Sequence, residues 1–196
     1  MYFEYKERQH KKCGWIEVIC GSMFSGKTEE LLRRLNREKI ARKKIELFKP
    51  SLDIRYSKNE VVSHNEVSME AIPVDNAFSI LLYITDEVDT IGIDEAQFFS
   101  DDIIEVCNLL ANKGKRVIVA GLDMDYLGNP FGPMPKLMAI AEDVTKLHAI
   151  CVKCGSLANY SFRKVANNNL ILLGESNEYE PLCRECYNSA MQITNQ

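Results

Sequence analysis

The sequence has no hydrophobic run long enough to cross a membrane. Its longest apolar stretches are strand-sized, such as VIVAGL at 117–122, whereas a membrane helix needs about 20 predominantly apolar residues. Residues 1–12, MYFEYKERQHKK, have no apolar core, so they do not resemble a signal peptide or an anchor. We expect them to form a flexible, solvated arm, and the alternative is a basic contact arm. These features predict a soluble, cytoplasmic protein without a membrane partner.

The sequence also has no excess of basic residues. It contains 24 lysines and arginines against 28 aspartates and glutamates, and its formal net charge is −4. A domain whose main ligand is a nucleic acid usually carries a net positive charge. We therefore expect no nucleic-acid partner, although this balance does not exclude a local basic groove.

An even set of cysteines suited to a disulfide framework is missing as well. Of the seven cysteines, four form two close pairs near the C-terminus, and Cys13, Cys20 and Cys107 are scattered. Cys20 and Cys107 lie among apolar residues. We expect these two to be small core side chains and not reactive thiols.

Short apolar runs alternate with helical patterns from residue 14 to about residue 150. The predicted strands cover 15–20, 44–50, 69–74, 88–96, 116–123 and 146–151, and the predicted helices cover 28–42, 76–85, 101–113 and 136–142. The polar segment 51–68 is predicted to be a loop, and Pro73 favours an edge position for the strand that contains it. This alternation indicates a mostly parallel sheet with helices on both faces. In such folds ligands bind at the carboxyl ends of the strands.

Residues 21–28, GSMFSGKT, match the pattern G-x-x-x-x-G-K-[ST] between a predicted strand and a predicted helix. The glycines allow the backbone N–H groups to point at phosphate oxygens, and the start of the helix adds positive potential. Lys27 is expected to contact the terminal phosphates, and the Thr28 hydroxyl is expected to ligate Mg²⁺. The alternative is a glycine-rich turn that matches by chance. The predicted nucleotide-binding residues of this segment are Gly21, Ser22, Met23, Phe24, Ser25, Gly26, Lys27 and Thr28.

The segment TIGIDEAQF at 90–98 supplies acidic residues at the end of another strand. Asp94 is placed where P-loop proteins hold Mg²⁺ through water. Glu95 projects the other way, where a carboxylate can take a proton from an attacking hydroxyl or water. A solvated turn residue is the alternative for Glu95. Gln97 is assigned to the same cofactor site.

Two CxxC pairs, Cys151/Cys154 and Cys183/Cys186, follow the alternating region. In a chain without secretory features, this spacing predicts one tetrahedral Zn²⁺ site. Four thiolates would leave no open coordination position for a substrate, so the site would be structural and not catalytic. Two separate redox pairs are one alternative. A second alternative has His148 competing as a ligand.

Six segments, taken in order, resemble the small thymidine kinases that join a P-loop domain to a zinc-binding lasso domain. The resemblance extends from about Gly14 to Tyr187 and rests on GSMFSGKTEELLRR, KPSLDIRYS, IGIDEAQFF, AGLDMDYLGNPFGPM, KLHAICVKCGSLANYSFRK and EYEPLCRECY. It implies an α/β fold of the P-loop NTPase, RecA-like type with a small zinc-ribbon-like lasso domain. The expected divisions are an arm at 1–12, an ATP-binding domain at 13–150, a lasso domain at 151–190 and a flexible tail at 191–196.

The resemblance implies transfer of the γ-phosphoryl group of ATP to the 5′-hydroxyl of thymidine. Glu95 would then be the catalytic base, Lys27 would bind the donor phosphates, Thr28 and Asp94 would serve Mg²⁺, and Arg55 would lie near the active site. The family is typically tetrameric and inhibited by dTTP. The residues expected to bind thymidine are Met23, Phe98, Leu122, Tyr126, Phe131, Ser161, Leu170, Leu172, Gly174 and Tyr179.

The chain departs from the family pattern at several of these positions. Tyr126 replaces a phenylalanine and keeps the ring, and Ser161 replaces a threonine and keeps the hydroxyl. Leu170 and Leu172 are bulkier than the valines of relatives, and Cys186 is a histidine in some members.

Two other function classes fit part of the sequence. A nucleic-acid-stimulated ATPase with a zinc ribbon would also use the P-loop and Glu95, but it predicts a basic stripe that is not evident here. A zinc-ribbon interaction module with a regulatory nucleotide site is the third.

Overall fold

The computed structural model describes residues 13–52, 60–62, 68–164 and 178–194, and most of them belong to an α/β domain built on one six-stranded sheet. The strand order is β5-β2-β6-β7-β1-β8, and every pairing within this sheet is parallel. The strands are β1 (Trp15–Gly21), β2 (Ile45–Pro50), β5 (Ile72–Val74), β6 (Thr90–Ile93), β7 (Arg116–Leu122) and β8 (Asp143–Leu147). The predicted parallel sheet is confirmed, and β5, which contains Pro73, lies at its edge.

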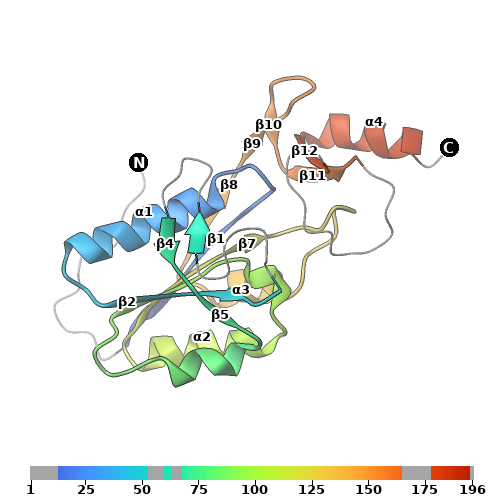
Figure 1. Ribbon diagram of the computed structural model, residues 1–196. Helices are drawn as coiled ribbons and strands as arrows, with labels where there is room; N and C mark the ends of the chain where they lie inside the picture. The colour runs from blue at the N-terminus through green and yellow to red at the C-terminus, as the bar shows by residue number, and fades with distance from the viewer. Residues whose placement is uncertain (1–12, 53–59, 63–67, 165–177, 195–196) are drawn as a thin grey trace.

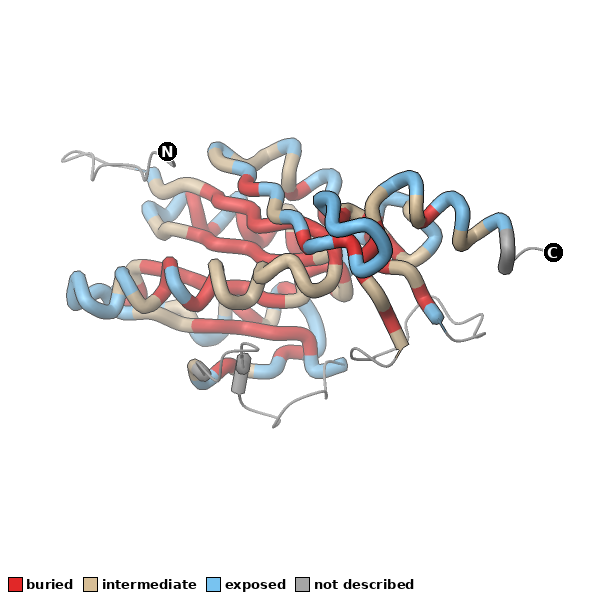
Figure 2. Tube along the Cα trace, turned by 90° about the horizontal axis from the view of Figure 1, so that it is seen from above, coloured by how far each residue is buried: buried red, intermediate tan, exposed pale blue. Residues whose placement is uncertain are grey.

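Helices cover both faces of the sheet (Figure 1). On one face, α1 (Lys27–Ile40) buries Leu31, Leu32 and Leu35 against the strands. On the other face lie α2 (Asp102–Asn112), α3 (Met134–Ile140) and the 3₁₀ helix η1 (Ala77–Leu82). The central strands β1, β6 and β7 are almost entirely buried between these layers, as Figure 2 shows, whereas the edge strands β5 and β8 are only partly buried. Cys20 and Cys107 lie in this core as predicted, and burial raises the pKa of Cys107 to about 12.

A smaller lobe follows β8 and projects beyond one end of the sheet (Figure 1). Its described residues form two antiparallel strand pairs and a helix: β9 (Ala149–Ile150), β10 (Leu157–Ala158), β11 (Tyr160–Arg163), β12 (Tyr179–Leu182) and α4 (Arg184–Thr194). Helix α4 extends past residue 190, where we expected the lobe to end. Tyr160, Leu182 and Tyr187 contribute to a separate small core.

Four predicted elements differ in the structure. The strand expected at 69–74 is two short strands, β4 (Ser68–Glu70) and β5, which belong to different sheets. The helix expected at 76–85 is the shorter 3₁₀ helix η1, whose first turn is capped by Asn76 Oδ1 accepting from the Ser79 backbone N–H at 3.0 Å. The strand expected at 146–151 is divided, because β8 pairs with β1 only as far as Leu147 and the chain then enters the small lobe. The loop expected at 51–68 contains β3 (Glu60–Val62), which pairs with β4 (Ser68–Glu70).

A buried ionic cluster joins three elements near the amino ends of the central strands. Glu17 of β1 accepts from Arg34 of α1 at 2.6 Å and from Arg116 of β7 at 2.7 Å. Glu17 is only 4% exposed, and its carboxylate has both arginines as partners. The cluster fixes α1 against the sheet at the end opposite the P-loop.

Within the described residues, no helix combines the length and the apolar character needed to span a bilayer.

Candidate active site

The segment GSMFSGKT, residues 21–28 and called the P-loop below, connects β1 to α1 at the carboxyl end of the sheet. Gly26 is the N-cap of α1 and has a left-handed backbone, with φ 83°, a conformation that glycine adopts without strain. The Lys27 ammonium donates to the Ser22 carbonyl at 2.8 Å. The Ser25 hydroxyl is buried and makes no hydrogen bond within the described part of the chain. A buried hydroxyl of this kind needs a partner, and a phosphate held at the helix start would supply one.

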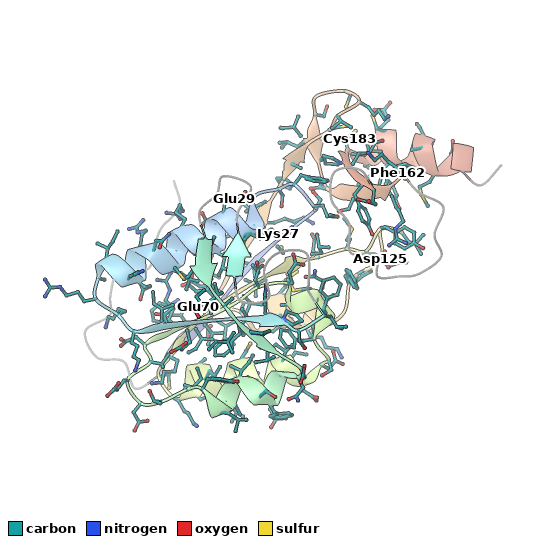
Figure 3. All side chains as sticks on the ribbon, in the orientation of Figure 1. Lys27, Glu29, Glu70, Asp125, Phe162 and Cys183 are labelled. Carbon is teal, nitrogen blue, oxygen red and sulfur yellow. The ribbon has the colours of Figure 1, made fainter. Side chains whose placement is uncertain are left out.

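The P-loop also contacts the small lobe. The Met23 backbone N–H donates to the Ser161 hydroxyl of β11 at 2.9 Å, and the Ser22 hydroxyl donates to the Ala158 carbonyl at 3.4 Å. Phe24 packs against the small-lobe core. Figure 3 shows Lys27 at the end of α1 that faces the lobe carrying Phe162 and Cys183. Residues 21–28 therefore lie at the junction of the α/β domain and the small lobe.

Thr28 and Asp94 meet beside the P-loop. The Thr28 hydroxyl donates to Asp94 Oδ2 at 3.3 Å, and Asp94 is buried directly after β6. A hydroxyl and a carboxylate are the hard oxygen donors that Mg²⁺ accepts, alongside waters and phosphate oxygens. The two side chains fit a Mg²⁺ ion bound together with a nucleotide.

Glu95 has an unusual backbone and a fixed side chain. Its φ and ψ are 52° and 40°, the left-handed region. Its carboxylate accepts from the Gln97 amide, and the Gln97 oxygen accepts from the Leu122 backbone N–H at 2.9 Å. Gln97 is only 3% exposed. This chain of bonds distinguishes Glu95 from a freely solvated turn residue.

Several residues assigned to the nucleoside pocket lie in contact with one another. Phe98 and Phe131 form an edge-to-face pair with ring centroids 5.8 Å apart. Arg163 of β11 lies over the Tyr126 ring and donates to the Tyr179 hydroxyl. Together with the Met23–Ser161 and Gln97–Leu122 bonds, these contacts involve all seven of the ten assigned residues that the structure describes. Arg55, Leu170, Leu172 and Gly174 lie outside the described residues.

The loop after β7 is held in place from several sides. Asp125 Oδ1, whose residue is labelled in Figure 3, accepts from the backbone N–H groups of Leu127 and Asn129, both at 2.9 Å. Gly132 has φ 50°, and a Cβ there would lie 2.4 Å from the Gln97 carbonyl oxygen, so this close approach requires glycine. The Tyr187 hydroxyl donates to the Tyr126 carbonyl at 2.8 Å.

Sequence reasoning did not assign functional roles to Arg163 or Tyr187. Both residues are in segments that carry the family resemblance, and Tyr187 directly follows the last cysteine. Their importance comes from contacts with residue 126, which is far away in the sequence. No local pattern contains that information.

The four paired cysteines form one cluster in the small lobe. The Sγ atoms of Cys151, Cys154, Cys183 and Cys186 all lie within 4.8 Å of one another. Zn–S bonds of about 2.3 Å in a tetrahedron place sulfurs roughly 3.8 Å apart, so the cluster fits a Zn²⁺ ion. It contradicts two separate redox pairs. His148 is bonded through Nδ1 to Asn159, so the cluster is complete without it.

The electrostatics of the cluster favour thiolate formation at one ligand. Burial opposes ionisation of Cys151, but the backbone N–H groups of Cys183, Cys154 and Lys153 lower the pKa of this thiol to about 6. A thiolate is the form that binds a metal.

Comparison with known proteins gives a consistent result. The family model described as "Thymidine kinase" matches residues 14–187. A thymidine kinase of Bacteroides thetaiotaomicron is 60% identical over 187 residues, covering 95% of this chain and 94% of the relative. A thymidine kinase of Porphyromonas gingivalis is 61% identical over 174 residues, covering 89% and 85%. One from a Rhodothermus species is 59% identical over 174 residues, covering 89% and 81%. These matches give no support to a nucleic-acid-stimulated ATPase.

Proposed function

Because the chain belongs to the thymidine kinase family, we propose that it transfers the γ-phosphoryl group of ATP to the 5′-hydroxyl of thymidine, giving dTMP and ADP. One observation carries the proposal. Gln97 is bonded at one end to Glu95 and at the other to Leu122, a residue assigned to the nucleoside pocket, while the preceding Asp94 is bonded to Thr28 at the start of α1. A hydroxyl of a nucleoside in that pocket is in position for attack on a phosphate at the P-loop.

The donor side of the reaction uses the P-loop. Lys27 and the backbone N–H groups at the start of α1 bind the phosphates of ATP and orient the γ-phosphoryl group. Thr28 and Asp94 would hold Mg²⁺, which neutralises charge on the phosphate oxygens. Arg55 is proposed to lie near the transferred group, as the family resemblance implies.

On the acceptor side, Glu95 accepts the proton of the thymidine 5′-hydroxyl. The bond from this oxygen to the γ-phosphorus forms while the bond from the γ-phosphorus to the β,γ-bridging oxygen breaks, and ADP leaves with that electron pair. Catalysis by the protein consists mainly of positioning and charge stabilisation.

The nucleoside is proposed to lie between the aromatic loop after β7 and the small lobe. The rings of Tyr126 and Phe131 suit stacking on a flat base. Met23, Phe98, Leu122, Ser161 and Tyr179 complete the pocket among the described residues, and Leu170, Leu172 and Gly174 are assigned to it from the resemblance. With the lobe closed over the nucleoside, water is kept from the reacting phosphate.

Several further properties are proposed from the family resemblance. The zinc ion would be structural, holding the lasso domain at 151–190 beside an ATP-binding domain at 13–150. The protein is proposed to be a cytoplasmic homotetramer, and dTTP is proposed to inhibit it from the nucleoside pocket. Size-exclusion chromatography with light scattering tests the assembly, and a dTTP titration of activity tests the inhibition.

The proposed activity is tested by measuring ADP formation with thymidine, deoxycytidine, deoxyguanosine or DNA offered separately. We expect rapid turnover with thymidine and a thymidine-dependent yield of dTMP. DNA should not raise the basal rate. Fast ADP formation with DNA, and none with any nucleoside, would contradict the kinase assignment and restore the nucleic-acid-stimulated ATPase.

A further inference from the structure

Arg163 is a buried arginine of the small lobe that contacts the aromatic loop after β7, the other side of the proposed pocket. It is the last residue of β11 and is only 6% exposed. Ser161, two residues earlier on the same strand, accepts from the Met23 backbone N–H of the P-loop. Side chains two apart on a strand share one face. Arg163 therefore extends from the face of β11 that is turned toward the proposed active site.

The first contact of Arg163 is with the ring of Tyr126. Its guanidinium carbon lies 3.6 Å from the ring centroid, a distance at which a planar guanidinium stacks on an aromatic face. Tyr126 lies on the irregular loop after β7. Its backbone is held separately, since the Tyr187 hydroxyl donates to its carbonyl at 2.8 Å. That bond holds the main chain, and the contact with Arg163 restrains the ring.

The second contact is with Tyr179 on β12. Arg163 donates from Nε at 3.1 Å and from Nη2 at 2.7 Å to the Tyr179 hydroxyl. Tyr179 is itself buried, and β11 pairs with β12 so that Arg163 is directly opposite Tyr179. One side chain thus holds two aromatic residues that come from different parts of the molecule.

We propose that Arg163 is a positioning residue that fixes the rings of Tyr126 and Tyr179 in the arrangement that receives the base of the nucleoside. This inference rests on the proposed thymidine kinase activity. Ordering two aromatic side chains during binding would cost conformational entropy, and a guanidinium that orders them beforehand removes that cost. Arg163 acts through the two tyrosines, so its loss affects nucleoside binding and leaves the P-loop unchanged.

The test compares wild type with Arg163→Met, which keeps the length and apolar stem of the side chain and loses the charge and the donors. We expect the KM for thymidine to rise about tenfold, because the contact with the Tyr126 ring and the hydrogen bonds to the Tyr179 hydroxyl are lost. The KM for ATP should change less than about twofold, because the two tyrosines that Arg163 holds are not assigned to the ATP site. Arg163→Lys keeps the charge without the planar fork, so its thymidine KM should lie between the two.

Arg184→Met is the matched control. Arg184 is an exposed arginine of the same lobe that lies over the ring of Tyr160, 5.2 Å from its centroid. It makes the same kind of aromatic contact with a ring that is not assigned to the proposed pocket. We expect its thymidine and ATP constants to equal those of wild type, with full zinc content.

The outcomes separate the inference from the proposed function. An active wild type with an unchanged thymidine KM in Arg163→Met overturns the positioning role. Equal rises in the KM for thymidine and for ATP also overturn it, because they indicate general loosening. If Arg163→Met does not fold, a wild-type thymidine KM in Arg163→Lys has the same consequence. A wild type that phosphorylates no thymidine refutes the proposed function itself.

Discussion

At the scale of single residues, the proposed chemistry depends on Glu95. Glu95→Gln keeps the shape of the side chain and removes the ability to accept a proton. We expect ATP binding to be retained and turnover with thymidine to fall by roughly 10²–10⁴-fold, the usual contribution of a general base. Thymidine-dependent ADP formation measures the loss, and a fluorescent ATP analogue measures binding. Turnover close to wild type would remove Glu95 from the role of base.

Gln97 provides a second test at this scale. Gln97→Leu preserves the approximate volume but deletes the bonds to the Glu95 carboxylate and to the Leu122 N–H. Hydrogen bonds to charged groups contribute about 1.5–3 kcal/mol, so we expect kcat to fall by roughly tenfold or more. Steady-state kinetics at saturating ATP and thymidine give this value. A kcat equal to that of wild type would show that Glu95 needs no such support.

The roles of some of these residues can be predicted from the sequence more directly than those of others. Lys27, Thr28, Asp94 and Glu95 are in short contiguous motifs whose spacing carries a mechanical reason. The link from Gln97 to Leu122 has no local signature, because it depends on how the loop after β6 lies against β7. Gln97 could be assigned to the site only from its neighbours in the chain.

At the scale of elements, the buried cluster around Glu17 couples α1 to β1 and β7. Burial opposes ionisation of Glu17, but hydrogen bonds and charge from Arg116, with further bonds from Trp15 and Arg34, hold its pKa below the usual 4.5. Glu17→Gln leaves two arginines facing a neutral amide. Breaking a buried pair costs about 3–5 kcal/mol, and we expect the free energy of unfolding at pH 7 to fall by about 3 kcal/mol.

The pH dependence of this loss has a defined sign. A carboxyl whose pKa is lowered in the folded state stabilises the fold above its unfolded pKa of 4.5, and this stabilisation disappears as the pH falls through the folded value. The difference between wild type and Glu17→Gln should therefore narrow below pH 4.5. Urea unfolding at several pH values measures it, with the exposed Glu105→Gln as control. Acid release of zinc affects all three proteins alike. A difference independent of pH would contradict this account.

Element types follow from the sequence where apolar periodicity is strong, as in α1, α2 and the central strands. Element types do not follow from the sequence where pairing between distant strands determines the secondary structure. The division between β8 and β9 occurs because the chain leaves the sheet after Leu147, and the apolar pattern of KLHAIC continues across that point. Likewise, β3 forms by pairing with β4 in a segment without periodicity.

At the scale of the whole molecule, the zinc cluster and the proposed nucleoside pocket are neighbours. Tyr187 follows Cys186 directly, donates from its backbone N–H to the Cys183 carbonyl at 2.9 Å, and holds the Tyr126 carbonyl through its hydroxyl. Removal of zinc should therefore release the aromatic loop as well as the lobe.

We expect chelation of zinc to abolish thymidine phosphorylation while ATP binding at the P-loop persists with reduced affinity. Measured zinc content, kinase assays and binding of a fluorescent ATP analogue on the same sample test this. Activity should return when zinc is added back. Full activity in a protein shown to contain no zinc would refute a structural role for the metal.

At residue 95, thermal stability and catalytic activity favour different amino acids, because the backbone there is left-handed and the side chain is the proposed base. A non-glycine residue in this conformation costs on the order of 1 kcal/mol or more, which glycine would not. A library of variants ranked by melting temperature alone would therefore enrich glycine at residue 95 and yield well-folded proteins without a base. Engineering this protein for higher thermal stability therefore requires that thymidine turnover be measured in every round of selection.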